Sequence, residues 1–505
     1  MSKYLVGTDS GTQSSRVIIF DTEGNIVAKG SAKHPDLILE RQGWSEHGEE
    51  DCWKGFCEAC RDALSKFKGD PKDIIGIGFS SQRGVTYCLD ENGRQLQRPI
   101  SWMDQRLAYG IEPMDREISP WWQFLRYYSK ANWTKVNRPE VFARTAKWLT
   151  NGGYLGYKLT GKFVDTIANQ NGGFPVDKSK FALHDEDWVY ECVGTRRDQL
   201  PEMFLPGEVM GYVSAEGAAA SGLPEGCPVI ACSGDKQGEV LGAGCIENGQ
   251  CYITFGTCTS LAMVADKDIP SPDTSYLVYM ACVPYQFNYE ASLSKGYWLI
   301  SWLRDNFAMD LAAEAAAQGV SIEELLNREA ADVPPGSEGL VIVPDWWSPR
   351  TRPNGKGVIL GFDDRHKRKH IFRAMIEGIS QQLKINTDIM CGQIGGAVTE
   401  IRAGGGGSKS PITMQATADI FGVPVRRTHT SETCAMGAAI CAAVGSGIYK
   451  TYEEAVEHMV GMGEVFTPIP ENVKLYAELR EKVHKKVYPT MKPIFDDLVE
   501  LTGQK

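Results

Sequence analysis

Short apolar runs alternate with longer amphipathic stretches along the first half of the chain. The apolar runs have the length and spacing of β-strands and cover residues 4–8, 16–20, 26–31, 74–80 and 229–233. A helical pattern of apolar positions covers residues 50–67. We also predict a strand at residues 85–89, which would pair with residues 74–80 as a hairpin across Arg83 and Gly84. Strands that alternate with helices in this way predict an α/β fold.

The second half repeats this order of elements. Strand-like runs cover residues 250–255, 261–264 and 399–403, and helical patterns cover residues 297–307, 321–331, 369–391, 411–421 and 435–444. Pro411 stands in the first turn of its predicted helix, where proline is tolerated. A short segment flanked by glycine, residues 245–249, lies between the two halves. The pattern therefore predicts a duplicated domain, with one copy at residues 1–245 and the other at residues 246–505.

The same short polar loop stands at the same place in both halves. Residues 9–15 read D-S-G-T-Q-S-S between two strand-like runs, and residues 256–260 read G-T-C-T-S between two others. A glycine-tipped hairpin of this kind directs backbone N–H groups and hydroxyls towards one point, which suits a phosphate group. Tight turns of this composition also occur without a ligand. Because the loop occurs twice, we favour two loops that hold the phosphates of one nucleotide from both sides.

Two aspartates at strand ends are candidates for chemistry. Asp9 ends the first predicted strand two positions before Gly11, where a carboxylate could hold a hydrated Mg²⁺ against phosphate. Asp235 follows the run at residues 229–233 and opens a short predicted helix. Its ordinary role would be to cap that helix, but the ends of parallel strands are also where α/β proteins bind ligands. There Asp235 could take the proton from a hydroxyl that attacks phosphorus.

Two further segments have the composition of binding surfaces. Residues 102–106, W-M-D-Q-R, combine an indole with acidic, amide and guanidinium groups, a set that suits a polyhydroxylated ligand. The alternative is a surface turn with a half-buried tryptophan. Four glycines and a serine at residues 404–408 follow a predicted strand, where bare backbone could accept a purine or a ribose.

Length, charge and cysteine usage limit the class of protein. A chain of 505 residues is too long for one hydrophobic core, which agrees with two domains. The net charge of −11 argues against a nucleic-acid partner, and no apolar stretch is long enough to span a bilayer. The first residues lack the pattern of a signal peptide, so we expect a cytoplasmic protein. The 14 cysteines, including the pair Cys57 and Cys60, are predicted to be small buried apolar side chains.

Several ordered motifs resemble those of the FGGY-type carbohydrate kinases, a family within the actin/Hsp70/sugar-kinase fold superfamily. The similarity covers nearly the whole chain, at residues 9–16, 42–53, 130–142, 157–161, 357–379 and 403–419. Residues 9–16, D-S-G-T-Q-S-S-R, match the phosphate loop of this family, and residues 403–408, A-G-G-G-G-S, resemble its adenosine-binding stretch. The resemblance implies an α/β protein of two RNase H-like domains that flank a deep catalytic cleft.

The resemblance also implies an activity, namely the phosphorylation of a hydroxyl of a small sugar or polyol with ATP and Mg²⁺. Asp235 matches the family's catalytic base, and Asp9 matches its aspartate for Mg²⁺ and phosphate. The positions that match or adjoin its ATP contacts are Thr12, Gln13, Ser14, Arg16, Gly256, Thr257, Gly405, Gly406 and Ser408. The positions that match or adjoin its substrate contacts are Gln82, Arg83, Trp102, Asp104 and again Asp235. No nucleic-acid or membrane partner is expected, and a homodimer is one assembly that the sequence leaves open.

The segments around the expected acceptor match neither the glycerol-kinase nor the xylulose-kinase pattern in full. Gln82 and Arg83 resemble the glycerol-kinase loop, but Gly84 replaces its acidic residue, and Lys236 stands where glutamine is typical. Asp104 is typical of xylulose-type kinases. We therefore expect a ketopentose such as xylulose, with glycerol, erythritol or another polyol as the alternative.

Two other classes of protein are weighed against a sugar kinase. One is an ATP-driven conformational protein of the actin/Hsp70 kind, which would have no sugar substrate. The other is a sugar-responsive binding protein that has lost catalysis. The second is disfavoured because the residues expected for phosphate, metal and proton transfer are all present.

Overall fold

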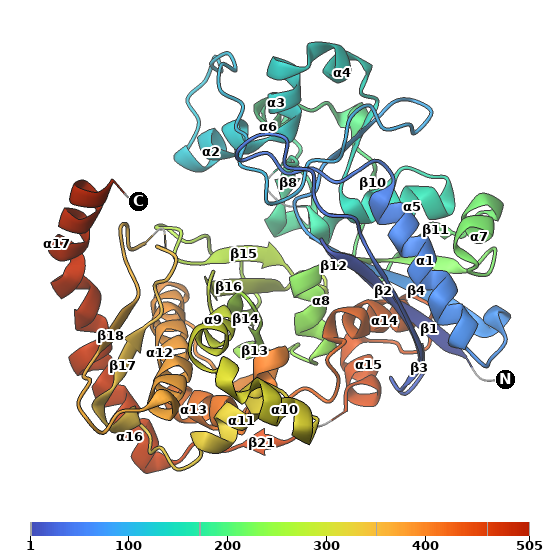
Figure 1. Cartoon of the computed structure of the whole chain (residues 1–505). Coiled ribbons are helices and arrows are strands. Elements are labelled where there is room, and N and C mark those ends of the chain that lie inside the picture. Colours follow the sequence, from blue (N-terminus) through green and yellow to red (C-terminus); the bar gives the residue numbers. More distant parts are fainter. Residues whose placement is uncertain (1–2, 171–172, 350, 462, 504–505) are drawn as a thin grey trace.

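Two mixed β-sheets, one in each half of the chain, form the framework of the protein, and helices pack on both (Figure 1). The computed structural model describes residues 3–170, 173–349, 351–461 and 463–503. The first sheet has the strand order β11-β12-β4-β1-β2-β3. Its strands are β1 (Tyr4–Ser10), β2 (Ser14–Asp21), β3 (Ile26–Lys33), β4 (Ile74–Ser81), β11 (Val209–Tyr212) and β12 (Pro228–Gly234).

Three parallel strands of the first sheet end at one edge. β1 pairs in parallel with β4, and β4 pairs in parallel with β12. The register places Ser10 opposite Ser81, and Ser81 opposite Gly234. Because Gln82 and Asp235 follow β4 and β12 directly, both residues lie at this edge together with the hairpin after β1.

The second sheet has the same arrangement, which confirms the predicted duplication and the α/β class. Its strand order is β15-β16-β14-β13-β19-β20-β21. As in the first sheet, an antiparallel hairpin, here β13 with β14, borders a row of parallel strands, here β19 and β20. Its strands are β13 (Gln250–Phe255), β14 (Thr259–Ala265), β15 (Leu277–Met280), β16 (Phe287–Leu293), β19 (Glu400–Gly404), β20 (Val425–Arg427) and β21 (Val465–Phe466).

Helices cover the sheets, and one of them joins the two halves. α1 (Asp51–Lys66) lies against β2 and β3, and α12 (Arg368–Ile394) lies against β14 and β16. α14 (Thr433–Gly445) comes from the second half of the chain but packs on β1, β4 and β12 of the first sheet. Its alanines share one apolar core with Leu5 and Ile18. The predicted boundary at residue 245 therefore separates the two sheets but not the two cores, and it stays a prediction.

Shorter elements connect these layers. The remaining strands form two-stranded sheets and are β5 (Tyr87–Leu89), β6 (Lys147–Leu149), β7 (Val164–Thr166), β8 (Val176–Asp177), β9 (Ala182–Leu183), β10 (Glu202–Phe204), β17 (Val341–Val343) and β18 (Val358–Leu360). The remaining α-helices are α2 (Pro120–Tyr128), α3 (Lys130–Asn137), α4 (Pro139–Arg144), α5 (Asn151–Thr160), α6 (Asp187–Val193), α7 (Ala215–Ser221), α8 (Asp235–Gly242), α9 (Trp298–Phe307), α10 (Ala312–Gln318), α11 (Ile322–Glu329), α13 (Pro411–Phe421), α15 (Tyr452–Met459), α16 (Pro470–Leu479) and α17 (Lys485–Thr502).

The hairpin predicted between residues 74–80 and 85–89 is wrong. β5 pairs instead with β6, in a separate two-stranded sheet. After β4 the backbone N–H of Gln82 donates to the carbonyl of Ser10, and Thr86 pairs with Ile100. The segment after β4 is thereby tied to the first hairpin instead of folding back on β4.

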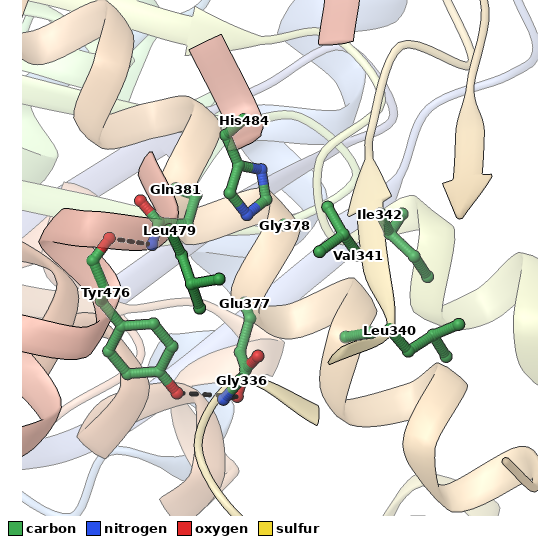
Figure 2. Close-up of a pocket in the computed structure, with 11 residues that line it drawn as sticks. Gly336, Leu340, Val341, Ile342, Glu377, Gly378, Gln381, Tyr476, Leu479 and His484 are labelled. Atoms are coloured by element: carbon green, nitrogen blue, oxygen red, sulfur yellow. Dashed lines mark hydrogen bonds between the residues drawn. The ribbon is translucent and has the colours of Figure 1, made fainter. Parts of the chain in front are cut away.

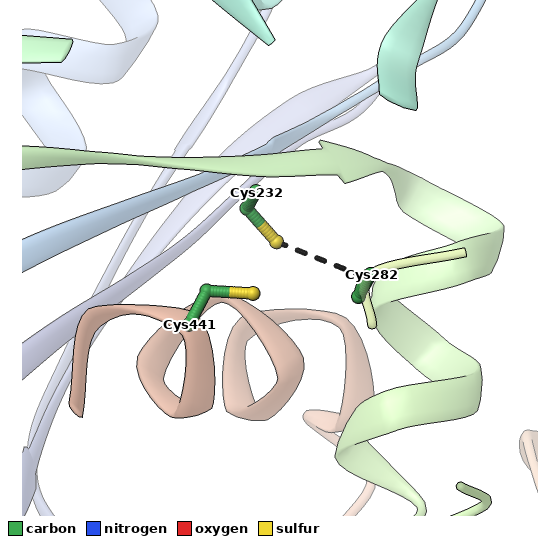
Figure 3. Close-up of side chains that lie close together, drawn as sticks. All are labelled: Cys232, Cys282 and Cys441. Carbon is green, nitrogen blue, oxygen red and sulfur yellow. Dashed lines mark hydrogen bonds between the residues drawn. The ribbon is translucent and has the colours of Figure 1, made fainter. Parts of the chain in front are cut away.

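Most of the cysteines are buried as predicted, but Cys258 is exposed and Cys391 is only partly buried. All fourteen are free and twelve of them are buried, including Cys57 and Cys60 in α1. Cys232, Cys282 and Cys441 lie together in the core between β12 and α14, with Cys232 Sγ 3.9 Å from Cys282 Sγ (Figure 3). They belong to an apolar cluster, and the hydroxyl of Ser233 lies 2.7 Å from Cys282 Sγ, surroundings that favour packing as their role. Among the described residues, no helix has the length and apolar character that a membrane span requires.

A buried polar cluster fastens the C-terminal helices to α12 (Figure 2). The carboxylate of Glu377 accepts hydrogen bonds from the Tyr476 hydroxyl at 2.7 Å and from the Ser337 hydroxyl at 3.1 Å. Nε of Arg373 donates to the same carboxylate at 2.9 Å. The cavity lined by Glu377, Tyr476 and their apolar neighbours measures about 10 Å³, room for a single water. Its size and the complete hydrogen bonding of Glu377 indicate a structural role.

Candidate active site

The predicted base Asp235 and the predicted Mg²⁺ ligand Asp9 occupy the shared edge of the first sheet. Asp235 is the first residue of α8, and its Oδ1 lies 3.5 Å from Nε of Arg83. About a third of the Asp235 side chain is exposed, at 31%. The cap of α8 is Gly234, so the alternative reading of Asp235 as the helix cap is wrong. The carboxylate is therefore held at the surface of the site and is accessible to a ligand.

Asp9 lies in a region with an excess of negative charge. Burial raises the pKa of Asp9 above its ordinary value of 3.8, Arg16 at 3.5 Å opposes this rise, and Asp235 and Glu432 add to it. Glu432 accepts a hydrogen bond from Nη1 of Arg16 at 3.1 Å and also pairs with Lys29. A bound cation would stabilise the ionised form of this carboxylate. The residues present therefore fit the expected Mg²⁺.

The first hairpin contacts the residues expected on the acceptor side. The hydroxyl of Thr12 donates to Oε1 of Gln82 at 3.0 Å and accepts a hydrogen bond from Nε1 of Trp102 at 2.9 Å. Thr12 therefore links the phosphate loop to both segments that the sequence assigns to the substrate. The other two predicted phosphate contacts of this loop, Gln13 and Ser14, are at least partly exposed.

A cavity of about 400 Å³ opens beside the second hairpin. Gly256, Thr257 and Gly406 line it together, as the hypothesis of a nucleotide site expects. Tyr297 and Trp298 supply aromatic walls. The backbone N–H of Tyr297 donates to the carbonyl of Gly256 at 3.1 Å, which fixes the hairpin from behind. The volume is in the range of small-molecule sites and accommodates a nucleoside.

Two other residues of the glycine-rich stretch shape this cavity without lining it. Gly405 has a φ of +82°, and a Cβ there would lie 2.9 Å from the backbone of Phe255. Ser408 is buried, and its hydroxyl donates to the carbonyl of Gly405 at 2.8 Å. The hydrogen of this hydroxyl is therefore used inside the turn, and the predicted contact of Ser408 with the nucleotide stays a prediction. Both residues hold the turn that presents Gly406.

Asp104 is a correction to the predicted substrate contacts. Its side chain is fully buried. The carboxylate accepts a hydrogen bond from the backbone N–H of Ser45 at 2.8 Å and from Nε of Arg106 at 2.7 Å, and Nζ of Lys130 lies 3.2 Å away. These partners leave no face for a sugar. Asp104 instead fixes the turn that carries Trp102, whose side chain is about half exposed, at 51%.

Three glutamates pair with site residues, and the sequence analysis missed all three. Glu290 of β16 lies 3.1 Å from Nη1 of Arg83, and Glu239 of α8 lies 3.1 Å from Nζ of Lys236. Glu239 stands three positions after Lys236, so helical spacing could have indicated that pair. No local signal marks Glu290, or Glu432, which lies 416 positions from its partner.

Comparisons with known proteins agree with this arrangement. The model of the FGGY family of carbohydrate kinases, N-terminal domain, matches residues 4–242, and the model of its C-terminal domain matches residues 251–446. A protein named uncharacterized sugar kinase YgcE, from Escherichia coli (strain K12), is 34% identical over 96% of this chain and 93% of its own length. The xylulose kinase of Bacillus subtilis (strain 168) is 27% identical over 97% of this chain and 98% of its own length.

A solved structure supports the fold independently. The crystal structure of xylulose kinase from Rhodospirillum rubrum superposes with a TM-score of 0.85 and 24% identity, over 98% of this chain and all of that one. This likeness confirms the two-domain fold expected from the resemblance. With both family models matched in order along the chain, the protein belongs to the FGGY family of carbohydrate kinases, phosphotransferases that act on sugar hydroxyls.

Proposed function

We propose that this protein transfers the γ-phosphoryl group of ATP to a hydroxyl of a small sugar, with a ketopentose such as xylulose as the first candidate. The position of Asp235 supports this proposal most. Its accessible carboxylate lies at the same edge as Asp9, next to Arg83 at 3.5 Å. A base at this place would meet the acceptor hydroxyl at the phosphate end of the nucleotide.

Asp235 would orient the attacking hydroxyl and receive its proton as the bond to phosphorus forms. In phosphoryl transfer such a base contributes mainly through positioning, since the transition state is loose. Arg83 would hold the carboxylate in the required direction. Gln82 and Trp102 are both hydrogen-bonded to Thr12. Gln82 would bind other hydroxyls of the acceptor, and the indole of Trp102 would cover its C–H face.

The phosphate end would be held by both hairpins. Asp9 would be the anionic ligand of Mg²⁺, which when bound neutralises charge on the phosphates. Arg16 and the loop of Thr12 would contact the same phosphates from the first sheet. Gly256 and Thr257 would contact them from the second, with the nucleoside in the adjacent cavity beside Gly406.

The choice of acceptor depends on few residues. The xylulose kinase that matches 97% of this chain favours a ketopentose. Asp104, which first suggested a ketopentose, no longer supports it directly because it is buried. Gln82 and Arg83 favour glycerol, erythritol or another polyol, and a glycerol kinase of Clostridium beijerinckii is 29% identical over 96% of this chain. A polyol is therefore the second candidate. The cytoplasmic location and the homodimer stay predictions.

A panel of acceptors tests the proposed function. ADP release is measured with ketopentoses, aldoses and polyols, and the product is identified by mass spectrometry. We expect ADP release that depends on one acceptor, with one phosphoryl group added to it. Vigorous ATP hydrolysis that no acceptor stimulates would instead favour a conformational ATPase and overturn the proposal.

A further inference from the structure

Arg83 is held by groups from the opposite half of the chain. Its Nη1 lies 3.1 Å from Oε2 of Glu290 in β16, and its guanidinium stacks over the ring of Tyr279 in β15, 4.2 Å from the centroid. The Arg83 and Glu290 side chains are mostly buried, at 15% and 12% exposed. The positive charge beside Asp235 is thus neutralised by a carboxylate that the second sheet supplies.

Lys236 is neutralised in the same way. It follows Asp235 directly in α8, and its Nζ lies 3.2 and 3.1 Å from the two carboxylate oxygens of Glu239. The pair is local, because the two residues are three positions apart on the helix. Burial opposes the charge on Lys236, but Glu239, Asp235 and Glu290 together raise its pKa, so the ammonium stays charged.

The two pairs determine the net charge that an acceptor meets. Arg83 with Glu290, and Lys236 with Glu239, each sum to zero, and Arg16 offsets Asp9 at 3.5 Å. The charge of Asp235, 3.5 Å from Arg83, is then left over as net negative charge. A carboxylate or phosphate on the acceptor would therefore enter a region in which the cations described near the base, Arg83, Lys236 and Arg16, each already pair with a carboxylate. Placing an anion there costs free energy that an uncharged hydroxyl does not incur.

Resting on the proposed kinase function, we propose that Glu239 and Glu290 are specificity-determining residues that exclude anionic acceptors, such as sugar acids, from the site where uncharged ones are phosphorylated. Each glutamate forms an ion pair with a cation that would otherwise be free to bind the carboxylate of an acid. Selectivity of this kind arises from a penalty against the wrong ligand, and it requires no new contact to the right one. Meanwhile the paired cations keep N–H donors for acceptor hydroxyls.

Matched acceptors with the same number of carbons test the proposal. The values of kcat/KM are measured for D-xylulose against D-xylonate and for glycerol against glycerate. For the wild type we expect a preference of at least a hundredfold for the uncharged member of whichever couple is used. Glu290→Gln and Glu239→Gln each free a cation, so each is expected to reduce that preference at least tenfold. Lys236→Gln leaves Glu239 unpaired and is expected to increase it.

The control and the contrary outcomes are distinct. Glu478→Gln removes a carboxylate of α16 that pairs with Lys482 at the surface, and it is expected to leave the preference unchanged. Because Glu239→Gln and Glu290→Gln change different elements, failure of one to fold leaves the other as the test. A wild type that favours the acids, or variants that leave the preference unchanged, would overturn this proposal while the kinase function stands. A wild type that phosphorylates no acceptor, neither in these couples nor in the panel of ketopentoses, aldoses and polyols, overturns both.

Discussion

The two hairpins that follow β1 and β13 occupy the same place in the two sheets but differ in chemistry. The first is flanked by Asp9 and Arg16, and Arg16 pairs with Glu432, the residue before α14. Thr12 connects this hairpin to the acceptor side by hydrogen bonds. The second, residues 256–258, carries no charged side chain and is held from behind by Tyr297. We propose that both hairpins hold phosphate. Among the described residues, the first has charged residues of its own chain segment and is hydrogen-bonded to the acceptor side, whereas Cys258 of the second lies near the charges of Glu290 and Lys236 that other elements supply.

Because of this difference, we expect the two hairpins to have different roles in the reaction. We expect the first hairpin to control the rate of transfer, because it holds the groups that respond to charge at the phosphate. We expect the second to control nucleotide affinity, because it borders the cavity of about 400 Å³. Changes confined to one hairpin should therefore separate kcat from KM for ATP.

Asp9→Asn is expected to give the largest separation. Loss of the anionic ligand for Mg²⁺ should lower kcat by roughly 10²–10³-fold, the usual cost of one electrostatic group at a reacting centre. Thr257→Ala in the second hairpin should raise KM for ATP and change kcat little. Steady-state kinetics at varied ATP and saturating acceptor measure both. Equal losses of kcat in the two variants would contradict the division of roles.

Glu432→Gln tests how far α14 supports the first hairpin. The charge-assisted hydrogen bond from Arg16 would weaken, and kcat should fall about tenfold, equivalent to about 1.4 kcal/mol in the barrier. The concentration of Mg²⁺ needed for half-maximal rate should rise as well, which a loss of stability alone would not cause. Glu481→Gln, at a surface pair with Lys485, is the matched control and should change neither value.

Alanine at two neighbouring glycines distinguishes packing from ligand contact at the second site. A Cβ at Gly407 would lie 2.5 Å from the ring of Tyr297, so Gly407→Ala should lower stability by about 1–3 kcal/mol and raise KM for ATP. A Cβ at Gly406 meets no protein atom within 4 Å, so Gly406→Ala should raise KM for ATP severalfold at unchanged melting temperature.

Gly392→Ala, at an open position of α12, is the control for both. An unchanged KM in Gly406→Ala, measured with a fluorescent or calorimetric ATP titration alongside, would remove this glycine from the nucleotide site.

The smallest expected effect is a pH dependence that only the first hairpin imposes. Because burial raises the folded-state pKa of Asp9 above 3.8, this carboxylate takes up a proton at a higher pH than an ordinary aspartate does. A protonated Asp9 cannot serve as an anionic ligand. The apparent affinity for Mg²⁺ should therefore fall a fewfold as the pH decreases towards the raised pKa of Asp9. Thr257→Ala should keep this dependence and Asp9→Asn should lose it. The same slope in all three proteins would exclude Asp9 as its source.

Local patterns in the sequence predicted much of this site. Asp9 lies at the end of the apolar strand β1, and Asp235 follows β12 directly. Thr12 and Thr257 stand in the repeated loop motif, so position along the chain was enough to propose all four. The predicted contact of Asp104 with the substrate rested on the composition of residues 102–106, which suits a polyhydroxylated ligand. The burial of Asp104 depends on Arg106, two positions away, and on Lys130 from α3, which pattern alone does not show.

Groups brought together by tertiary folding escaped the sequence analysis. Glu290 reaches Arg83 only because β16 of the second sheet approaches the end of β4, and Glu432 reaches the first hairpin only because α14 packs on the first sheet. The prediction that residues 85–89 pair with β4 was wrong for a related reason. Gln82 bonds to Ser10, a contact that no periodicity signals.

The most direct test of the kinase mechanism is acceptor-dependent ADP formation by Asp235→Asn beside the wild type, with ATP binding measured calorimetrically in both. Removal of the base at the end of β12 should lower transfer by roughly 10²–10⁴-fold while ATP binds with nearly unchanged affinity, because the nucleotide cavity lies at the second hairpin. Turnover near that of the wild type in Asp235→Asn would contradict the account.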